Sequence, residues 1–141
     1  MRYADWPSRL QAYLDLHRDE KFKYGARDCC LFTAGCIEAM TGVDIAAWFR
    51  GRYSTRKESL ARIKERTGKA SIQAVIEYVA AEHSFQPIPV SMAQRGDMVL
   101  IGKGARAVVG VVSLSGLDVM CLTRDQVVRV ALNYATFAWR V

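Results

Sequence analysis

Residues 22–32, which read FKYGARDCCLF, decide the fold of this chain. Gly25 predicts a tight turn, and Asp28 then stands at the N-cap of the helix that follows. Cys29 falls in the first turn of this helix, where unpaired backbone N–H groups and the positive end of the helix dipole lower a thiol pKa. We therefore interpret Cys29 as a nucleophile position and Asp28 as its helix cap. Cys30 points away from Cys29 on a helix, so it is interpreted as a core residue.

Helix signals recur along the first half of the chain. The helix that begins at Asp28 is apolar almost all round until Gly42, so we expect it to be central and buried. The rules of capping and periodicity predict three further helices, over residues 6–19, from Thr55 to the residue before Gly68, and from Ser71 onward.

Beyond His83 the pattern changes from helix to strand. Pro87 and Pro89 interrupt any helix, and the apolar runs become short and rich in valine. These runs predict strands over residues 98–101, 107–112, 118–122, 126–130 and 138–141. Helices followed by an antiparallel sheet indicate an α+β fold, with the helix after Asp28 packed across the sheet. At 141 residues, 51% of them hydrophobic, we expect residues 1–141 to form a single domain.

Composition narrows the classes of function. No apolar stretch approaches membrane-spanning length, and the charges among the first twenty residues argue against a signal peptide. Three of the four cysteines lie close together on one predicted helix, so we expect reduced thiols and no disulfide framework. The chain has no Cys-x-x-Cys pair and its two histidines stand alone, so we expect neither a metal site nor a cofactor.

The net charge of +6 lies in one segment of the chain. Residues 50–69 carry eight basic and two acidic residues, and the charges of the remaining chain cancel. Few aromatic residues are interleaved there for base stacking, so we expect this segment to face a neighbouring protein or solvent and not nucleic acid. Arg50, Arg52 and Tyr53 are expected to anchor a protein contact, because arginine and tyrosine are favoured at interface hot spots.

Several motifs, in this order along the chain, resemble those of the NlpC/P60 cysteine peptidases. They are the aromatic-Gly-x-x-Asp-Cys motif at Tyr24–Cys29, the Gly-Asp turn at Gly96–Asp97 and the strand at Val108–Val112. The chain is similar in particular to a phage- and prophage-borne branch of NlpC/P60-like tail proteins. That closer similarity lies in residues 5–7, 28–32, 41–44, 49–53 and 138–140. The resemblance implies a papain-like fold whose C-terminal sheet is small and barrel-like.

The resemblance also implies roles for particular residues. Cys29 falls at the nucleophile position and Tyr24 at the aromatic residue of the preceding loop. Val108 takes the position of the catalytic histidine, and a valine can neither accept nor donate a proton. His83 is the only histidine after Cys29 and stays as a candidate base, whereas His17 lies in an apolar helix stripe and is interpreted as a packing residue. The family's orienting polar residue has no assigned counterpart among Ser113, Ser115 and Asp118.

Two hypotheses of function follow. In the first, the protein is a structural component of a bacteriophage tail, at the tip or baseplate, whose catalytic dyad has decayed. It then acts through the cleft around Tyr24, Asp28 and Cys29 and through the basic segment 50–69. Its partners are other tail or baseplate proteins, and it resides in the virion after synthesis in the bacterial cytoplasm.

In the second hypothesis the protein is an active cysteine endopeptidase or amidase that cleaves peptidoglycan peptides during phage DNA entry. Cys29 is then the nucleophile, and the base comes from outside the expected position, for example from His83 or a neighbouring chain. A nucleic-acid binder is a third and less favoured hypothesis, and it predicts an affinity that falls steeply with salt.

Overall fold

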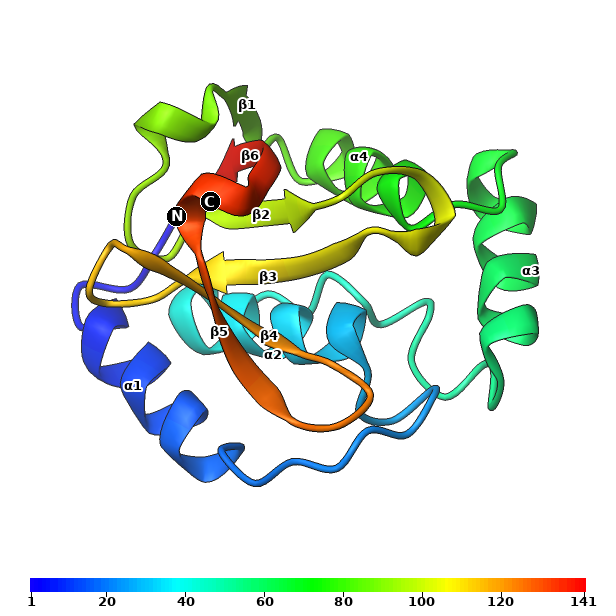
Figure 1. Ribbon diagram of the computed structural model, residues 1–141, viewed down its shortest axis with the longest axis horizontal. Helices are drawn as coiled ribbons and strands as arrows, with labels where there is room; N and C mark the ends of the chain where they lie inside the picture. The colour runs from blue at the N-terminus through cyan, green and yellow to red at the C-terminus, as the bar shows by residue number, and fades with distance from the viewer.

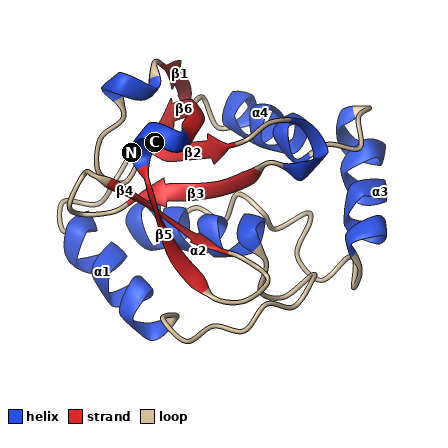
Figure 2. Cartoon of the chain, viewed as in Figure 1, coloured by secondary structure: helices blue, strands red, loops and turns tan.

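The computed structural model describes residues 1–141, in which four helices precede a six-stranded sheet (Figures 1 and 2). The helices are α1 (Trp6–Leu16), α2 (Cys29–Thr41), α3 (Arg56–Thr67) and α4 (Ile72–Glu82). The strands are β1 (Gln86–Ile88), β2 (Met98–Ile101), β3 (Val108–Val112), β4 (Asp118–Leu122), β5 (Val127–Ala131) and β6 (Ala135–Arg140). None of the helices combines the length and the apolar character needed to cross a membrane.

The predicted helix caps are confirmed. Asp28 Oδ1 accepts a hydrogen bond from the backbone N–H of Leu31 at 3.0 Å, and α2 ends at Gly42, whose φ of 78° lies in the left-handed region. The Thr55 and Ser71 hydroxyls cap α3 and α4 in the same way.

The first helix ends earlier than predicted, at Leu16 and not at residue 19. His17 is its C-cap, with its ring 4.1 Å from the ring of Tyr13 and its Nδ1 3.0 Å from a carboxylate oxygen of Glu20. His17 is half-buried against these two side chains, which agrees with its interpretation as a packing residue.

The sheet is antiparallel throughout, with strand order β1-β6-β2-β3-β4-β5. It therefore has two free edges, β1 and β5, and does not close into the barrel-like form that the resemblance implies. The strand β1 was not predicted because Pro87 interrupts it, and a proline is tolerated there because β1 pairs on one side only. The strand β6 begins at Ala135, three residues before the predicted start.

The helix α2 packs across β3 and β4, as predicted, and lies behind these strands in Figure 1. Its residues Cys36, Ile37 and Met40 are fully buried in the main hydrophobic core. Thr33 Oγ1 donates a hydrogen bond to the backbone oxygen of Val109 at 3.2 Å, which fixes the helix against β3. This contact sets the position of the start of α2, and so of Cys29, relative to β3.

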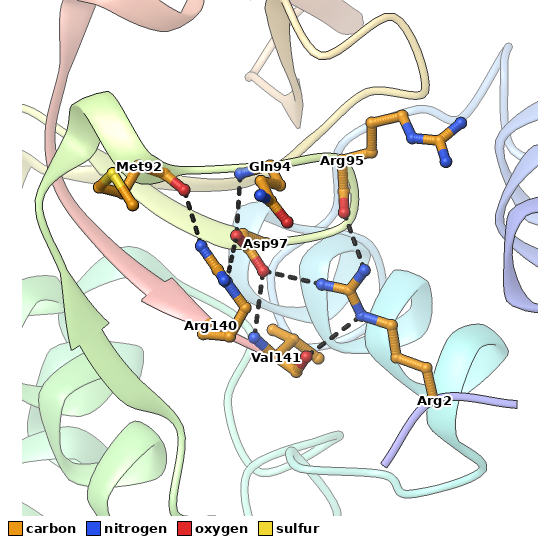
Figure 3. A network of polar contacts seen from close by, with 7 residues as sticks. All are labelled: Arg2, Met92, Gln94, Arg95, Asp97, Arg140 and Val141. Carbon is orange, nitrogen blue, oxygen red and sulfur yellow. Dashed lines mark hydrogen bonds and ion pairs between the residues drawn. The ribbon is translucent and has the colours of Figure 1, made fainter.

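Asp97 joins the two ends of the chain (Figure 3). Its carboxylate closes the Gly96–Asp97 turn by accepting a hydrogen bond from the backbone N–H of Gln94 at 2.9 Å. The fully buried carboxylate also pairs with Arg2 at 2.7 Å and Arg140 at 2.9 Å, and Arg2 Nε donates to the backbone oxygen of Val141 at 3.1 Å. The Gly-Asp turn is thus the centre of an ion-pair network that spans the whole length of the sequence.

Candidate functional site

A cavity of about 500 Å³ opens at the start of α2. Of its 18 lining residues, 12 are hydrophobic. Its walls come from the loop before α2, the segment before α3, the first turns of α3 and α4, the start of β3 and the end of β4. The apolar walls include the side chains of Phe22, Tyr24, Phe49, Leu60, Ile72 and Leu122. The volume is typical of a small-molecule site.

Asp28 is buried at the edge of this cavity, and its carboxylate oxygens are occupied. Oδ1 caps α2 through Leu31, and Oδ2 accepts the backbone N–H of Gly25 at 3.1 Å. Oδ2 also accepts a hydrogen bond from the hydroxyl of Tyr53. The carboxylate thus accepts three hydrogen bonds within the protein, and these contacts support the interpretation of Asp28 as a helix cap and not as an acid or base.

Tyr53 belongs to the cavity and not to an exposed contact surface. It is buried, it packs on Phe49 with ring centroids 4.4 Å apart, and its hydroxyl reaches Asp28. Burial, together with the negative charge of Asp28, raises the pKa of the Tyr53 hydroxyl. The interpretation of Tyr53 as an exposed partner anchor is therefore wrong, because the loop after Phe49 folds inward over the helix cap.

The thiols of Cys29 and Cys30 both line the cavity, and both residues are half-buried. The pKa of Cys29 lies below its ordinary value, chiefly because the Cys30 thiol stabilises the thiolate, with the backbone of Val109 adding to this against the effect of burial. The pKa of Cys30 is raised well above its ordinary value by the same contact with Cys29 and by burial. Of the two thiols, Cys29 is the more acidic.

Cys30 packs against the main hydrophobic core, which agrees with its interpretation as a packing residue, and it also borders the cavity. No helical turn precedes the first two residues of α2, so side chains on neighbouring faces of the helix can both reach the open space beside it.

Val108 lines the same cavity from the start of β3. Val108 and Cys29, which the resemblance sets at the positions of the catalytic base and the nucleophile, therefore share one cavity. No histidine lines it. His83 caps the C-terminal end of α4, beside Phe85, with its Nε2 3.8 Å from a carboxylate oxygen of Glu82. The structure does not bring His83 to the cavity that holds Cys29.

The other predicted residues divide between the cavity and the surface. Tyr24 lines the cavity and packs edge-on against Phe22, with ring centroids 4.8 Å apart. Arg50 lies outside the cavity, paired with Asp44 at 3.0 Å, and Arg52 is exposed.

Sequence reasoning missed five polar residues of the cavity, which are Arg56, Ser59, Arg106, Thr123 and Arg124. Thr123 follows β4, in the region where the family's orienting residue is expected. Thr123 lines the same cavity as Val108, and no sequence signal placed it there, because the β3–β4 register that pairs Val111 with Met120 is known only from the folded sheet. The Thr123 hydroxyl is used in its own turn, donating to the backbone oxygen of Gln126 at 2.9 Å.

Comparison with solved structures supports the fold. The crystal structure of the NlpC/p60 domain of the peptidoglycan hydrolase SagA matches with a TM-score of 0.60 and 16% sequence identity, over 96% of this chain and 98% of that one. At this identity the likeness concerns the fold alone, and it confirms the NlpC/P60-like, papain-like architecture. No curated protein sequence matches the chain. A family model matches residues 1–141, so the chain belongs to the family described as Domain of unknown function (DUF6950).

Proposed function

We propose that this protein is a non-hydrolytic, structural component of a bacteriophage tail, at the tip or baseplate. The main support for the loss of catalysis is the residue at position 108. Val108 lines the cavity that contains Cys29, where the resemblance requires a catalytic base. The assignment to a phage tail rests on the sequence resemblance described above.

The energetics support a binding role over catalysis. Although the pKa of Cys29 is lowered, no base stands beside it to transfer a proton, and general acid–base catalysis contributes about 10²- to 10⁴-fold in rate. Asp28 cannot replace the missing base, because its oxygens already accept hydrogen bonds from Gly25, Leu31 and Tyr53.

The basic segment 50–69 supplies a surface for partners. Its exposed cations without an ion pair are Arg52, Arg56, Lys57, Lys64, Arg66 and Lys69. Such a surface suits an acidic face of a neighbouring tail protein, since complementary charge favours association and fixes orientation.

A second candidate function is hydrolysis of peptidoglycan peptides. The observation that favours it is the lowered pKa of Cys29 at the start of α2. A base must then be supplied by a neighbouring chain or by a rearrangement that brings His83 to the cavity.

Two experiments test the proposal. Purified protein incubated with peptidoglycan is expected to release no muropeptides, and release that is lost in Cys29→Ser would establish the hydrolytic alternative. For the tail role, phage particles purified from a lysate of the producing strain are expected to contain this chain when analysed by mass spectrometry. Particles that lack it, while the lysate contains it, would contradict the structural role.

A further inference from the structure

We propose that the cavity at the start of α2 binds a free fatty-acid carboxylate, with the alkyl chain between the apolar walls and the carboxylate at the arginines of the rim. This inference goes beyond the proposed function by naming the ligand class of the same cavity. It depends on the proposed function in one respect. A protein without hydrolytic activity is expected to hold a ligand that has no bond for Cys29 to cleave, and a free fatty acid is such a ligand.

The interior of the cavity suits an alkyl chain. Apart from the arginines and the hydroxyl of Tyr24, the oxygen-bearing side chains of the lining already have partners within the protein. Tyr53 donates to Asp28, the Ser59 hydroxyl donates to the backbone oxygen of Arg56 at 2.7 Å, and the Thr123 hydroxyl donates to Gln126. A polar peptide placed there would leave its amide groups without partners, which costs free energy, whereas methylene groups need none.

The charge at the rim suits a carboxylate. Arg106 and Arg124 both line the cavity, both are exposed, and neither takes part in an ion pair or side-chain hydrogen bond within the chain. Arg56, also on the rim, donates one hydrogen bond to the backbone oxygen of Ala105 at 2.9 Å, which leaves other donors of its guanidinium free. The lining thus contains three arginines and a single carboxylate, Asp28, whose oxygens already accept hydrogen bonds, so no carboxylate of the lining is available to pair with the arginines.

The combination points to one ligand chemistry. An apolar cavity with a few placed polar groups is typical of small-molecule sites, and arginine binds carboxylates through two parallel hydrogen bonds. A neutral hydrocarbon would leave the arginines unused, and a cationic amphiphile would be repelled by them.

The test uses decanoate below its micelle concentration, measured by isothermal titration calorimetry at pH 7.5. Decan-1-ol and decyltrimethylammonium carry the same chain with a neutral and a cationic end. We expect decanoate to bind at least about tenfold more tightly than either, because a hydrogen-bonded charge pair is lost in each case. Equal affinity for the three would overturn the proposal.

Variants locate the ligand in the cavity. Arg106→Ala and Arg124→Ala are each expected to weaken decanoate binding by about tenfold. Arg18→Ala removes the same charge from an exposed residue that does not line the cavity, and it is expected to leave decanoate binding unchanged. An equal loss in all three variants would show non-specific attraction and contradict the assignment.

A measurement on the unaltered protein guards against misfolded variants. Bound decanoate is expected to slow alkylation of Cys29 by iodoacetamide, because both occupy the same cavity. Unchanged alkylation at saturating decanoate would place the ligand elsewhere and overturn the proposal.

Tighter binding of a muropeptide than of decanoate, or binding to phosphatidylglycerol vesicles but not to decanoate, would assign the cavity to a different ligand. Because decanoate cannot be hydrolysed, its binding or failure to bind leaves the result of the peptidoglycan assay unchanged.

Discussion

The hydroxyl of Tyr53 donates a hydrogen bond to Oδ2 of Asp28, the carboxylate that caps α2. This contact joins the segment before α3 to the start of the central helix and forms one edge of the cavity that holds Cys29. The two residues lie 25 positions apart, so the hydrogen bond exists only because the loop after Phe49 turns back over the helix cap.

The Tyr53→Phe variant tests this contact. The substitution keeps the ring that packs on Phe49 and removes only the hydroxyl, so Asp28 loses one of its three donors. We expect the free energy of unfolding to fall by about 1–3 kcal/mol, the usual cost of a buried hydrogen bond to a charged group. Urea denaturation followed by circular dichroism measures it. Tyr134→Phe, at an exposed position, is the matched control, and a similar loss there would contradict the argument.

The Asp97→Asn variant tests the network that joins the chain ends. It removes the charge that pairs with Arg2 and Arg140, and leaves both guanidinium groups without their partner. We expect a loss of about 1.5–3 kcal/mol in the free energy of unfolding, the usual contribution of hydrogen bonds to a charged group, because the carboxylate is buried but both arginines are partly exposed.

Asp118→Asn provides the comparison for Asp97, because Asp118 pairs with the exposed Arg129 at 3.6 Å. Such a surface pair contributes about 0–1 kcal/mol. Equal losses in the two variants would mean that the Asp97 network contributes no more than a surface ion pair.

The Val108→His variant tests why the thiol lacks a base. It places an imidazole on the start of β3, in the cavity that Cys29 lines. A thiolate paired with a protonated histidine has a lower pKa, and one unit of pKa corresponds to about tenfold more thiolate. We expect iodoacetamide to alkylate Cys29 about tenfold faster at pH 6.5, as measured by peptide mass spectrometry. Val128→His, on β5 and outside the cavity, is the control. The same rate for Val108→His and the unaltered protein would show that position 108 is not the base position.

Stability is expected to fall at alkaline pH, in part through Cys121. Burial, together with the charge of Cys29, raises the pKa of Cys121 to about 11, whereas in the unfolded chain it lies near the ordinary value of about 8.5. Between these values the unfolded chain has already lost the proton that the folded protein keeps, so the free energy of unfolding decreases as the pH rises.

The Cys121→Ala variant measures this contribution to the pH dependence. We expect its decline in stability between pH 8 and pH 11, relative to its own value at pH 7, to be shallower by up to about 3 kcal/mol. Urea denaturation across this pH range gives the two curves. Parallel curves for the variant and the unaltered protein would mean that Cys121 does not titrate in the way its burial implies.

The sequence by itself determined the parts of this protein that depend on neighbouring residues. Helix starts at Asp28, Thr55 and Ser71 follow from hydrogen bonds to backbone groups three positions away, and such contacts are visible in the order of the residues. The valine-rich runs gave most of the strands, and the motif around Cys29 and Val108 indicated the papain-like fold before the structural comparison confirmed it.

Only the tertiary structure decided how the cavity is built. Tyr53 turns inward to Asp28, Cys30 shares the cavity with Cys29, and Arg106 and Arg124 reach the rim from segments late in the chain. The pairing of Asp97 with Arg2 and Arg140 likewise joins residues from opposite ends of the sequence. These contacts depend on how α2 packs across the sheet and how the loops close around its first turn. No local pattern encodes them, because each joins residues that only the folded chain brings together.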